Sequence, residues 1–245
     1  MHKFFKPIVF LAALAPFLWL AFRALTARLT ANPIEDLTLT TGIWALRMLV
    51  ITLAITPLRR LTGWNRVIPY RRTFGLFAFF YAVLHLATYF LDQGFALEFI
   101  IADVLKRRFI TVGVLAFALM VPLAFTSTKG WIRRLGKRWV VLHRLVYISG
   151  MLAVVHYLWK VKIAAGPPVY YALIVGVLLA LRVFWALRKR SLRARGRACA
   201  RWPTSSSGPP RSPTRRADCH FSPSTARLPG IPSAAVGRRL PYKHA

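Results

Sequence analysis

The sequence predicts an all-α polytopic membrane protein, a bundle of six transmembrane helices followed by a disordered basic C-terminal tail. Of its 245 residues, 56% are hydrophobic, and they form blocks of roughly 17–25 residues, the length that crosses a bilayer. The chain carries 36 Lys and Arg against 6 Asp and Glu. A nucleic-acid-binding protein can be equally basic, but long apolar blocks do not interrupt its charge. We therefore expect contact with membrane lipid and none with nucleic acid.

Each apolar block is expected to be a helix, because backbone groups in lipid must be hydrogen-bonded within their own segment. The first block follows Lys3 and Lys6, as a signal peptide would. No clean small-residue cleavage site follows it and further spans do, so we interpret it as the first span. In chain order, the predicted spans are residues 7–23, 42–58, 74–91, 109–125, 140–159 and 169–187.

The charges between the spans predict the orientation of the chain. Lys and Arg concentrate at the N-terminus and in loops 59–73 and 126–139, which lie on one side of the membrane. Most of the acidic residues lie in the loops on the other side. The positive-inside rule then places both termini in the cytoplasm.

The composition changes after the sixth span. Residues 1–190 form the predicted membrane domain, and residues 191–245 form a tail rich in Pro, Ser and Arg that has little to bury and should be disordered. A polybasic contact with anionic lipid is one interpretation of this tail, and a segment without function is the one that we favour. Both cysteines, Cys199 and Cys219, lie in the tail, so metal chemistry in the apolar part must use histidine.

Ionisable residues within spans are costly and usually functional. His85 and His156 are predicted to lie at similar depth in the outer half of the membrane, on the third and fifth spans. Two imidazoles at one level on different helices are what axial ligation of a heme requires. A single intramembrane histidine can instead bond a neighbouring helix or relay protons, and zinc is disfavoured because no carboxylate or thiolate joins the pair.

His143 is a third candidate heme ligand, near the cytoplasmic end of the fifth span. It lies about 20 Å from His156 along a helix axis, and on an ideal helix the two side chains point about 140° apart. Either the helix is distorted near Gly150, or the two histidines serve different partners.

Three arginines within the spans are candidate partners of the heme propionates, because a guanidinium group binds a carboxylate through two hydrogen bonds. Arg47 lies near the outer end of the second span, and Arg144 and Arg182 lie near the inner ends of the fifth and sixth. Extension of each side chain to the nearest lipid headgroups explains their positions equally well.

Four stretches of the chain resemble the MsrQ (YedZ) family: TGIWALRMLVITLAITPLRR (41–60), RRTFGLFAFFYAVLHLATYFLD (71–92), TSTKGWIRRLGKRWVVLHRLVY (126–147) and HYLWKVK (156–162). The members of this family are heme-binding membrane subunits of the protein-methionine-sulfoxide reductase system of Gram-negative bacteria, within the ferric-reductase-like transmembrane group. The resemblance covers about residues 5–190, and its histidines correspond to His85, His143 and His156.

The resemblance implies heme b and an associated FMN as cofactors. It also implies electron transfer from the respiratory quinone pool, or from a cytosolic flavin reductase, to a periplasmic molybdopterin subunit, MsrP. That partner reduces methionine sulfoxide in oxidised periplasmic proteins, a two-electron repair. The chain would then be an electron-transfer subunit without a catalytic site of its own. His143 would ligate a second heme or line a quinone or flavin pocket.

Two other functions remain open. A stand-alone transmembrane ferric or quinone reductase would need no partner, but a ferric reductase of that kind normally carries an NADPH- and flavin-binding domain after the sixth span, and the tail is too short for one. A transporter or channel is disfavoured, because it predicts discontinuous helices and charged residues along a path.

Overall fold

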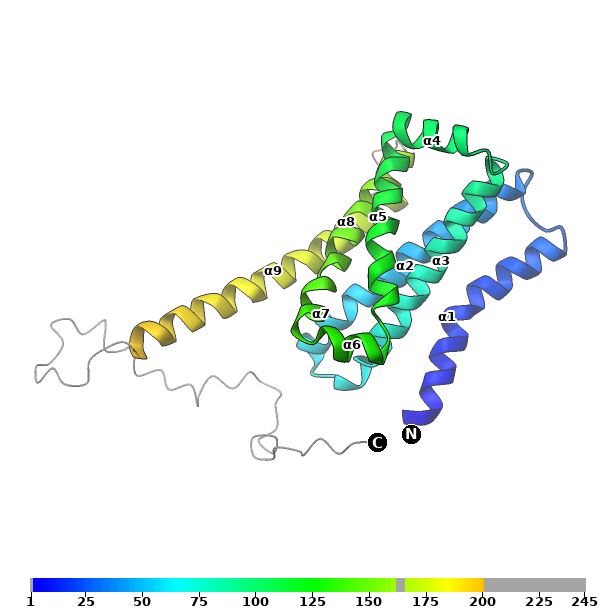
Figure 1. Cartoon of the computed structure of the whole chain (residues 1–245). Helices are drawn as coiled ribbons and strands as arrows, with labels where there is room; N and C mark the ends of the chain where they lie inside the picture. The colour runs from blue at the N-terminus through cyan, green and yellow to red at the C-terminus, as the bar shows by residue number, and fades with distance from the viewer. Residues whose placement is uncertain (1, 162–165, 201–245) are drawn as a thin grey trace, which may run out of the picture. The chain divides into compact units, whose positions relative to one another are not determined.

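The computed structural model describes residues 2–161 and 166–200, and all regular structure within these ranges is helical (Figure 1). Six segments of this part of the chain are long and apolar enough to cross a membrane, which confirms a multi-pass membrane protein. The long helices are α1 (His2–Leu25), α2 (Pro33–Thr62), α3 (Tyr70–Asp92), α5 (Arg108–Phe125), α8 (Leu145–Val161) and α9 (Pro167–Ala200).

Four short helices connect the long ones: η1 (Asn65–Val67), α4 (Leu97–Lys106), α6 (Lys129–Leu135) and α7 (Lys137–Leu142). The fifth crossing is therefore not one helix, because α7 ends at Leu142 and α8 begins at Leu145. The expected distortion near Gly150 is wrong, since α8 runs through that residue without a break. The interruption lies at His143 itself, which follows the last residue of α7.

The chain divides into two compact units, Met1–Arg182 and Val183–Ala245. In the second unit, the described residues are the C-terminal part of α9, which continues through residues 191–200. The predicted disordered tail was expected to begin at residue 191. The rest of that predicted tail, residues 201–245, lies outside the described residues.

The first unit is built from two helical hairpins, α2 with α3 and α5 with α8, whose helices pack most extensively on each other (Figure 1). Small residues on α8 allow it to pack closely on α5 and on α2. Ser149 is fully buried, and its hydroxyl donates to the carbonyl oxygen of Ala116 on α5 at 3.0 Å. A Cβ atom added at Gly150 would lie 3.1 Å from Cδ1 of Leu53 on α2. Both contacts fix α8 against its neighbours.

Helix α1 is held to the hairpins at its proline. Pro16 lies inside α1 and has no N–H to donate to the preceding turn, so the backbone there needs another partner. The hydroxyl of Tyr81 on α3 accepts from the Phe17 N–H at 3.1 Å and donates to the Ala13 carbonyl at 2.8 Å. In a regular α-helix, the Phe17 N–H would donate directly to the Ala13 carbonyl. A buried tyrosine therefore bridges the helical turn beside the proline.

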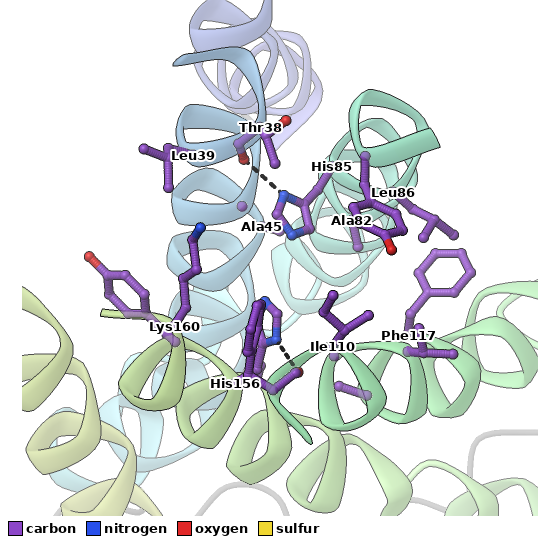
Figure 2. Close-up of a pocket in the computed structure, with 18 of the residues that line it drawn as sticks. Thr38, Leu39, Ala45, Ala82, His85, Leu86, Ile110, Phe117, His156 and Lys160 are labelled. Carbon is purple, nitrogen blue, oxygen red and sulfur yellow. Dashed lines mark hydrogen bonds between the residues drawn. The ribbon is translucent and has the colours of Figure 1, made fainter. Parts of the chain in front are cut away.

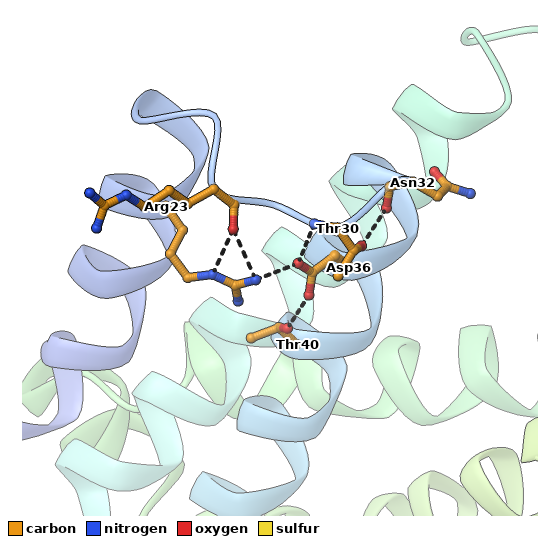
Figure 3. A network of polar contacts seen from close by, with 6 residues as sticks. Arg23, Thr30, Asn32, Asp36 and Thr40 are labelled. Atoms are coloured by element: carbon orange, nitrogen blue, oxygen red, sulfur yellow. Dashed lines mark hydrogen bonds and ion pairs between the residues drawn. The ribbon is translucent and has the colours of Figure 1, made fainter.

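The loop between α1 and α2 is closed by a polar network around Asp36 (Figure 3). The guanidinium group of Arg23 donates to the Asp36 carboxylate at 2.8 Å, and the Thr30 backbone and the Thr40 hydroxyl also donate to it. Asn32 caps α2 by accepting from the Glu35 N–H. The carboxylates in the first turn of α2 also favour its positive end. This network fixes the beginning of α2, which contributes to the site described below.

The bundle has two ends, which we name by their short helices. The α4 end carries the α1–α2 loop and α4, and the α6–α7 end carries η1, α6 and α7 (Figure 1). Because long helices alternate in direction, α2 and α5 run away from the α4 end, and α3 and α8 run toward it.

Replacement of Tyr81 by phenylalanine should destabilise the bundle, because the backbone groups of Ala13 and Phe17 lose a buried partner. We expect the free energy of unfolding to fall by about 1–3 kcal/mol, measured by SDS titration of the detergent-solubilised protein. Tyr170→Phe is the control, since Tyr170 is 65% exposed. Equal stability of both variants would contradict the bridging role.

Candidate functional site

The structure brings His85 of α3 and His156 of α8 together in the half of the bundle nearer the α4 end. Their ring centroids lie 6.1 Å apart, and the ring planes are inclined at 77° (Figure 2). Sequence reasoning placed the two residues at similar depth on different helices. The folded chain adds that the imidazoles face each other directly.

A hydrogen bond to a helix carbonyl orients each imidazole. Nδ1 of His85 lies 2.8 Å from the Thr38 carbonyl oxygen on α2, and Nδ1 of His156 lies 2.7 Å from the Phe109 carbonyl oxygen on α5. A carbonyl oxygen can only accept, so Nδ1 must carry the proton in both rings. The lone pair of each ring is then on Nε2, and the two Nε2 atoms face each other in Figure 2. This is the arrangement of metal-ligating histidines, in which a second contact fixes the tautomer.

Two glycines make these bonds possible. A helix carbonyl points toward the residue four positions later, and here those residues are Gly42 and Gly113. A Cβ atom at Gly42 would lie 3.0 Å from Nδ1 of His85, and one at Gly113 would lie 2.7 Å from Nδ1 of His156. A larger residue at either position would displace the ring from its carbonyl partner.

The two halves of the site repeat in the sequence. Each histidine follows its carbonyl partner by 47 residues. The set Thr38, Gly42 and His85 recurs 71 positions later as Phe109, Gly113 and His156. Two alanine pairs have the same offset and also line the site, namely Ala45 with Ala116 and Ala82 with Ala153. The hairpins α2–α3 and α5–α8 are therefore equivalent halves of one site.

A cavity of about 380 Å³ lies between these hairpins, and both histidines line it. This volume is in the range of small-molecule and cofactor sites. The walls toward the α6–α7 end are apolar and include Leu46, Leu49 and Met120. Besides the histidines, the polar and charged lining residues lie toward the α4 end and are Asn32, Glu35, Thr38, Tyr89, Asp92, Gln93, Arg107, Tyr157 and Lys160.

The ligand set of this cavity fits a heme better than a bare metal ion. Within residues 2–161 and 166–200, no group of three or more His, Cys, Asp and Glu side chains is placed to hold a metal. Zinc sites use three or four protein ligands. Heme iron takes four nitrogens from its porphyrin and needs only axial ligands from the protein. Two imidazoles with free Nε2 atoms on opposite walls can fill both axial positions.

The separation of the two rings is consistent with this ligation. A metal–imidazole bond is about 2.0–2.1 Å long for zinc, so two nitrogens on opposite sides of one ion lie roughly 4 Å apart. The centroid of each ring lies farther out than its nitrogen by half the width of the ring. The centroids of two such imidazoles are therefore expected to be separated by a distance close to the observed 6.1 Å.

His143 does not join this pair. It lies at the α6–α7 end, where its ring stacks on Trp139 with the centroids 3.9 Å apart, and its Nδ1 bonds the Trp139 carbonyl at 3.1 Å. Its Nε2 is buried and has no hydrogen-bond partner among the described residues. The structure thus separates the histidines into two sites, as the alternative with different partners requires.

The three candidate arginines lie outside the lining of the cavity. Arg47 donates to the Tyr171 hydroxyl at 3.0 Å and covers the ring of Trp44. Arg144 is exposed. Arg182 donates to the Tyr147 hydroxyl and, at 2.9 Å, to the Leu53 carbonyl. Tyr147 and Leu53 lie toward the α6–α7 end of the bundle, so Arg182 lies in the same half as His143. We call His143 and Arg182 together the second polar site.

Several residues of the site were not identified from the sequence: Thr38, Gly42, Phe109, Gly113, Arg107 and Lys160. The backbone carbonyls of Thr38 and Phe109 leave no trace in residue type. The glycines and histidines leave such a signal, because Gly42 and His85 recur 71 residues later as Gly113 and His156. A comparison of the sequence with itself would have found this repeat.

Known proteins match most of the chain. Residues 41–154 match the family model of the ferric reductase like transmembrane component. A curated relative from Herminiimonas arsenicoxydans is 53% identical over 190 residues, which cover 76% of this chain and 87% of that protein. It is a protein-methionine-sulfoxide reductase heme-binding subunit, MsrQ. The chain belongs to the MsrQ family.

Other MsrQ proteins match to a similar extent. The subunit from Rhodospirillum rubrum is 50% identical over 74% of this chain and 88% of its own length. The subunit from Xanthomonas axonopodis pv. citri is 48% identical over 78% of this chain and 90% of its own length. No solved structure matches the chain. Membership of the MsrQ family confirms the resemblance found in the sequence.

Replacement of Gly113 by alanine should crowd His156, because the new methyl group would lie 2.7 Å from Nδ1 and 2.8 Å from Cε1. We expect the free energy of unfolding to fall by about 1–3 kcal/mol, measured by SDS titration. Gly176→Ala on α9 is the matched control, since no heavy atom lies within 4 Å of its added Cβ. If both variants were equally stable, the close packing of His156 on α5 would be refuted.

Proposed function

We propose that this chain holds a heme b between His85 and His156 and serves as the membrane electron-transfer subunit of a methionine-sulfoxide reductase. The observation that carries the proposal is the pair of facing imidazoles, 6.1 Å apart, with each Nδ1 bonded to a helix carbonyl. The relatives also support the proposal, because the curated MsrQ proteins are named as heme-binding subunits.

The pair of histidine ligands is suited to electron transfer and not to reduction of a substrate at the heme iron. A bound heme supplies one-electron transfer, whereas repair of methionine sulfoxide takes two electrons. His85 and His156 would hold the heme iron from opposite walls of the cavity and would leave it no open coordination site for a substrate. Apolar walls exclude water from the inner part of the cavity. Sulfoxide reduction therefore belongs to a partner subunit.

The proposed partner is a periplasmic molybdopterin reductase of the MsrP type, which repairs oxidised periplasmic proteins. It would dock at the α4 end, close to the histidine pair. This assignment places the chain in the bacterial inner membrane with both termini in the cytoplasm. Its support is the basic character of the loops at the α6–α7 end, which include Arg59, Arg66 and Arg133.

Electrons would enter at the α6–α7 end from the quinone pool or from a cytosolic flavin reductase. The second polar site lies at this end, with the free Nε2 of His143 and the guanidinium group of Arg182. These groups suit an anionic or carbonyl-bearing ligand, such as a quinone, an FMN or a second heme. We assign His143 and Arg182 to that entry site. Arg47 and Arg144 stay predicted partners of the heme propionates, although neither residue lines the cavity.

A stand-alone ferric or quinone reductase is the second candidate. The match of residues 41–154 to the ferric reductase like family favours it. The two functions differ in their electron acceptor, which a kinetic measurement can identify.

The visible spectrum tests the heme site. The purified protein in detergent should show the α band of a reduced b-type heme after addition of dithionite. His85→Ala and His156→Ala should each lose the heme of this cavity, because one axial ligand is removed. His143→Ala should retain it, since that residue lies at the other end of the bundle. A colourless wild-type protein supplied with heme during expression would refute the proposal.

The acceptor is tested by reoxidation of the reduced protein. In stopped-flow measurements, the purified molybdopterin partner and a methionine-sulfoxide peptide together should reoxidise the protein much faster than ferric citrate does. The partner without the peptide should accept electrons only up to its own redox capacity. Rapid reoxidation by ferric citrate alone, with none by the partner, would favour the stand-alone reductase instead.

A further inference from the structure

The charged end of the cavity is the feature that the proposed ligation does not use. Two residues extend the histidine helices toward the α4 end by one turn, Tyr89 after His85 and Lys160 after His156. Because α3 and α8 run in the same direction, both side chains lie about 6 Å beyond the imidazoles along the helix axes. They are equivalent in the two halves of the site, but only Lys160 carries a positive charge.

Lys160 is placed to meet a ligand in this cavity. Its side chain extends from α8 toward α2, beside the two imidazoles (Figure 2). Its ammonium group lies 5.9 Å from the centroid of the Phe109 ring, which belongs to the residue that orients His156. In the described part of the chain, the ion pairs join Arg23 with Asp36 and Arg107 with Asp103. Lys160 therefore faces the cavity without a carboxylate partner.

The other charged groups that line the cavity at this end are already engaged within the protein. Arg107 pairs with Asp103 at 3.2 Å, and the Tyr89 hydroxyl also donates to Asp103. The carboxylate of Glu35 accepts from the amide of Asn32 at 3.3 Å. The Asp92 carboxylate accepts from the amide of Gln93 at 3.5 Å. Among the described residues that line the cavity, the cation without an ion pair is thus Lys160.

A heme brings the anion that this position needs. It is an apolar disc with two propionate carboxylates on one edge, and the cavity is apolar at one end and charged at the other. We propose that Lys160 binds a propionate of the heme held by His85 and His156, so that the carboxylate edge faces the α4 end. This inference rests on the proposed heme site, and it differs from the arginine partners expected from the sequence.

The proposal is tested by removing the positive charge of Lys160 or the negative charges of the propionates. The apoprotein is reconstituted with heme or with heme dimethyl ester, whose propionates are uncharged. Lys160→Met is compared with the wild type, with Lys160→Arg and with Lys106→Met. The last variant removes the same charge from the exposed surface of α4. The dissociation constant of heme and its reduction midpoint potential are measured for each pair.

With heme, Lys160→Met should weaken binding by about tenfold to a hundredfold, the range for hydrogen bonds between charged groups. Its midpoint potential should fall, because a nearby positive charge favours the reduced state. Lys160→Arg should restore both values, and Lys106→Met should change them little. With the dimethyl ester, the difference in dissociation constant between Lys160→Met and the wild type should disappear.

Two outcomes would overturn the proposal. If Lys160→Met weakens the binding of heme and of its dimethyl ester equally, the lysine does not bind a propionate, although the heme site itself stands. If heme binding is unaffected by Lys160→Met but lost in His85→Ala, another residue binds the propionates. Failure of the wild type to bind heme would remove both the proposed function and this inference.

Discussion

The hydrogen bond between an imidazole Nδ1 and a helix carbonyl is the interaction on which the rest of this site depends. It occurs twice, at 2.8 Å and 2.7 Å, and each time it fixes both the tautomer and the direction of a histidine. It also requires a glycine one turn along the helix that supplies the carbonyl, since a side chain there would occupy the space of the ring. Helix packing, residue size and ligand chemistry are thus linked at each histidine.

The membrane scaffold and the pairing of His85 with His156 could be predicted from the sequence, because both follow from length. Apolar blocks of membrane-spanning length fix the number of crossings, and alternation of direction fixes the depth of each residue. The position of a residue within its span therefore predicts its depth in the membrane. The ends of the helices were less accurate, as α2 begins at Pro33 and α9 continues to Ala200.

Other features depend on contacts that no local pattern reveals. The carbonyls of Thr38 and Phe109 are backbone groups, so their residue types carry no signal. The break between α7 and α8 lies at His143 and Arg144, where no proline marks it, and the stacking of His143 on Trp139 accompanies it. The short helix α4 has apolar residues at helical spacing, but at 10 residues it is too short to cross a membrane. Lys160 was read as a loop charge because the end of the fifth span was placed before it.

The recurrence of the site at an offset of 71 residues bears on the origin of such a chain. Two separate copies of one hairpin, related by a two-fold axis, would each supply a carbonyl, a glycine and a histidine to a shared metal. A half-length ancestor would in this way be a symmetric dimer with its cofactor on the axis. Fusion of the copies into one polypeptide leaves the two histidines equivalent but releases every other pair from symmetry. Tyr89 and Lys160 are such a pair, and their difference gives the cavity two chemically distinct walls.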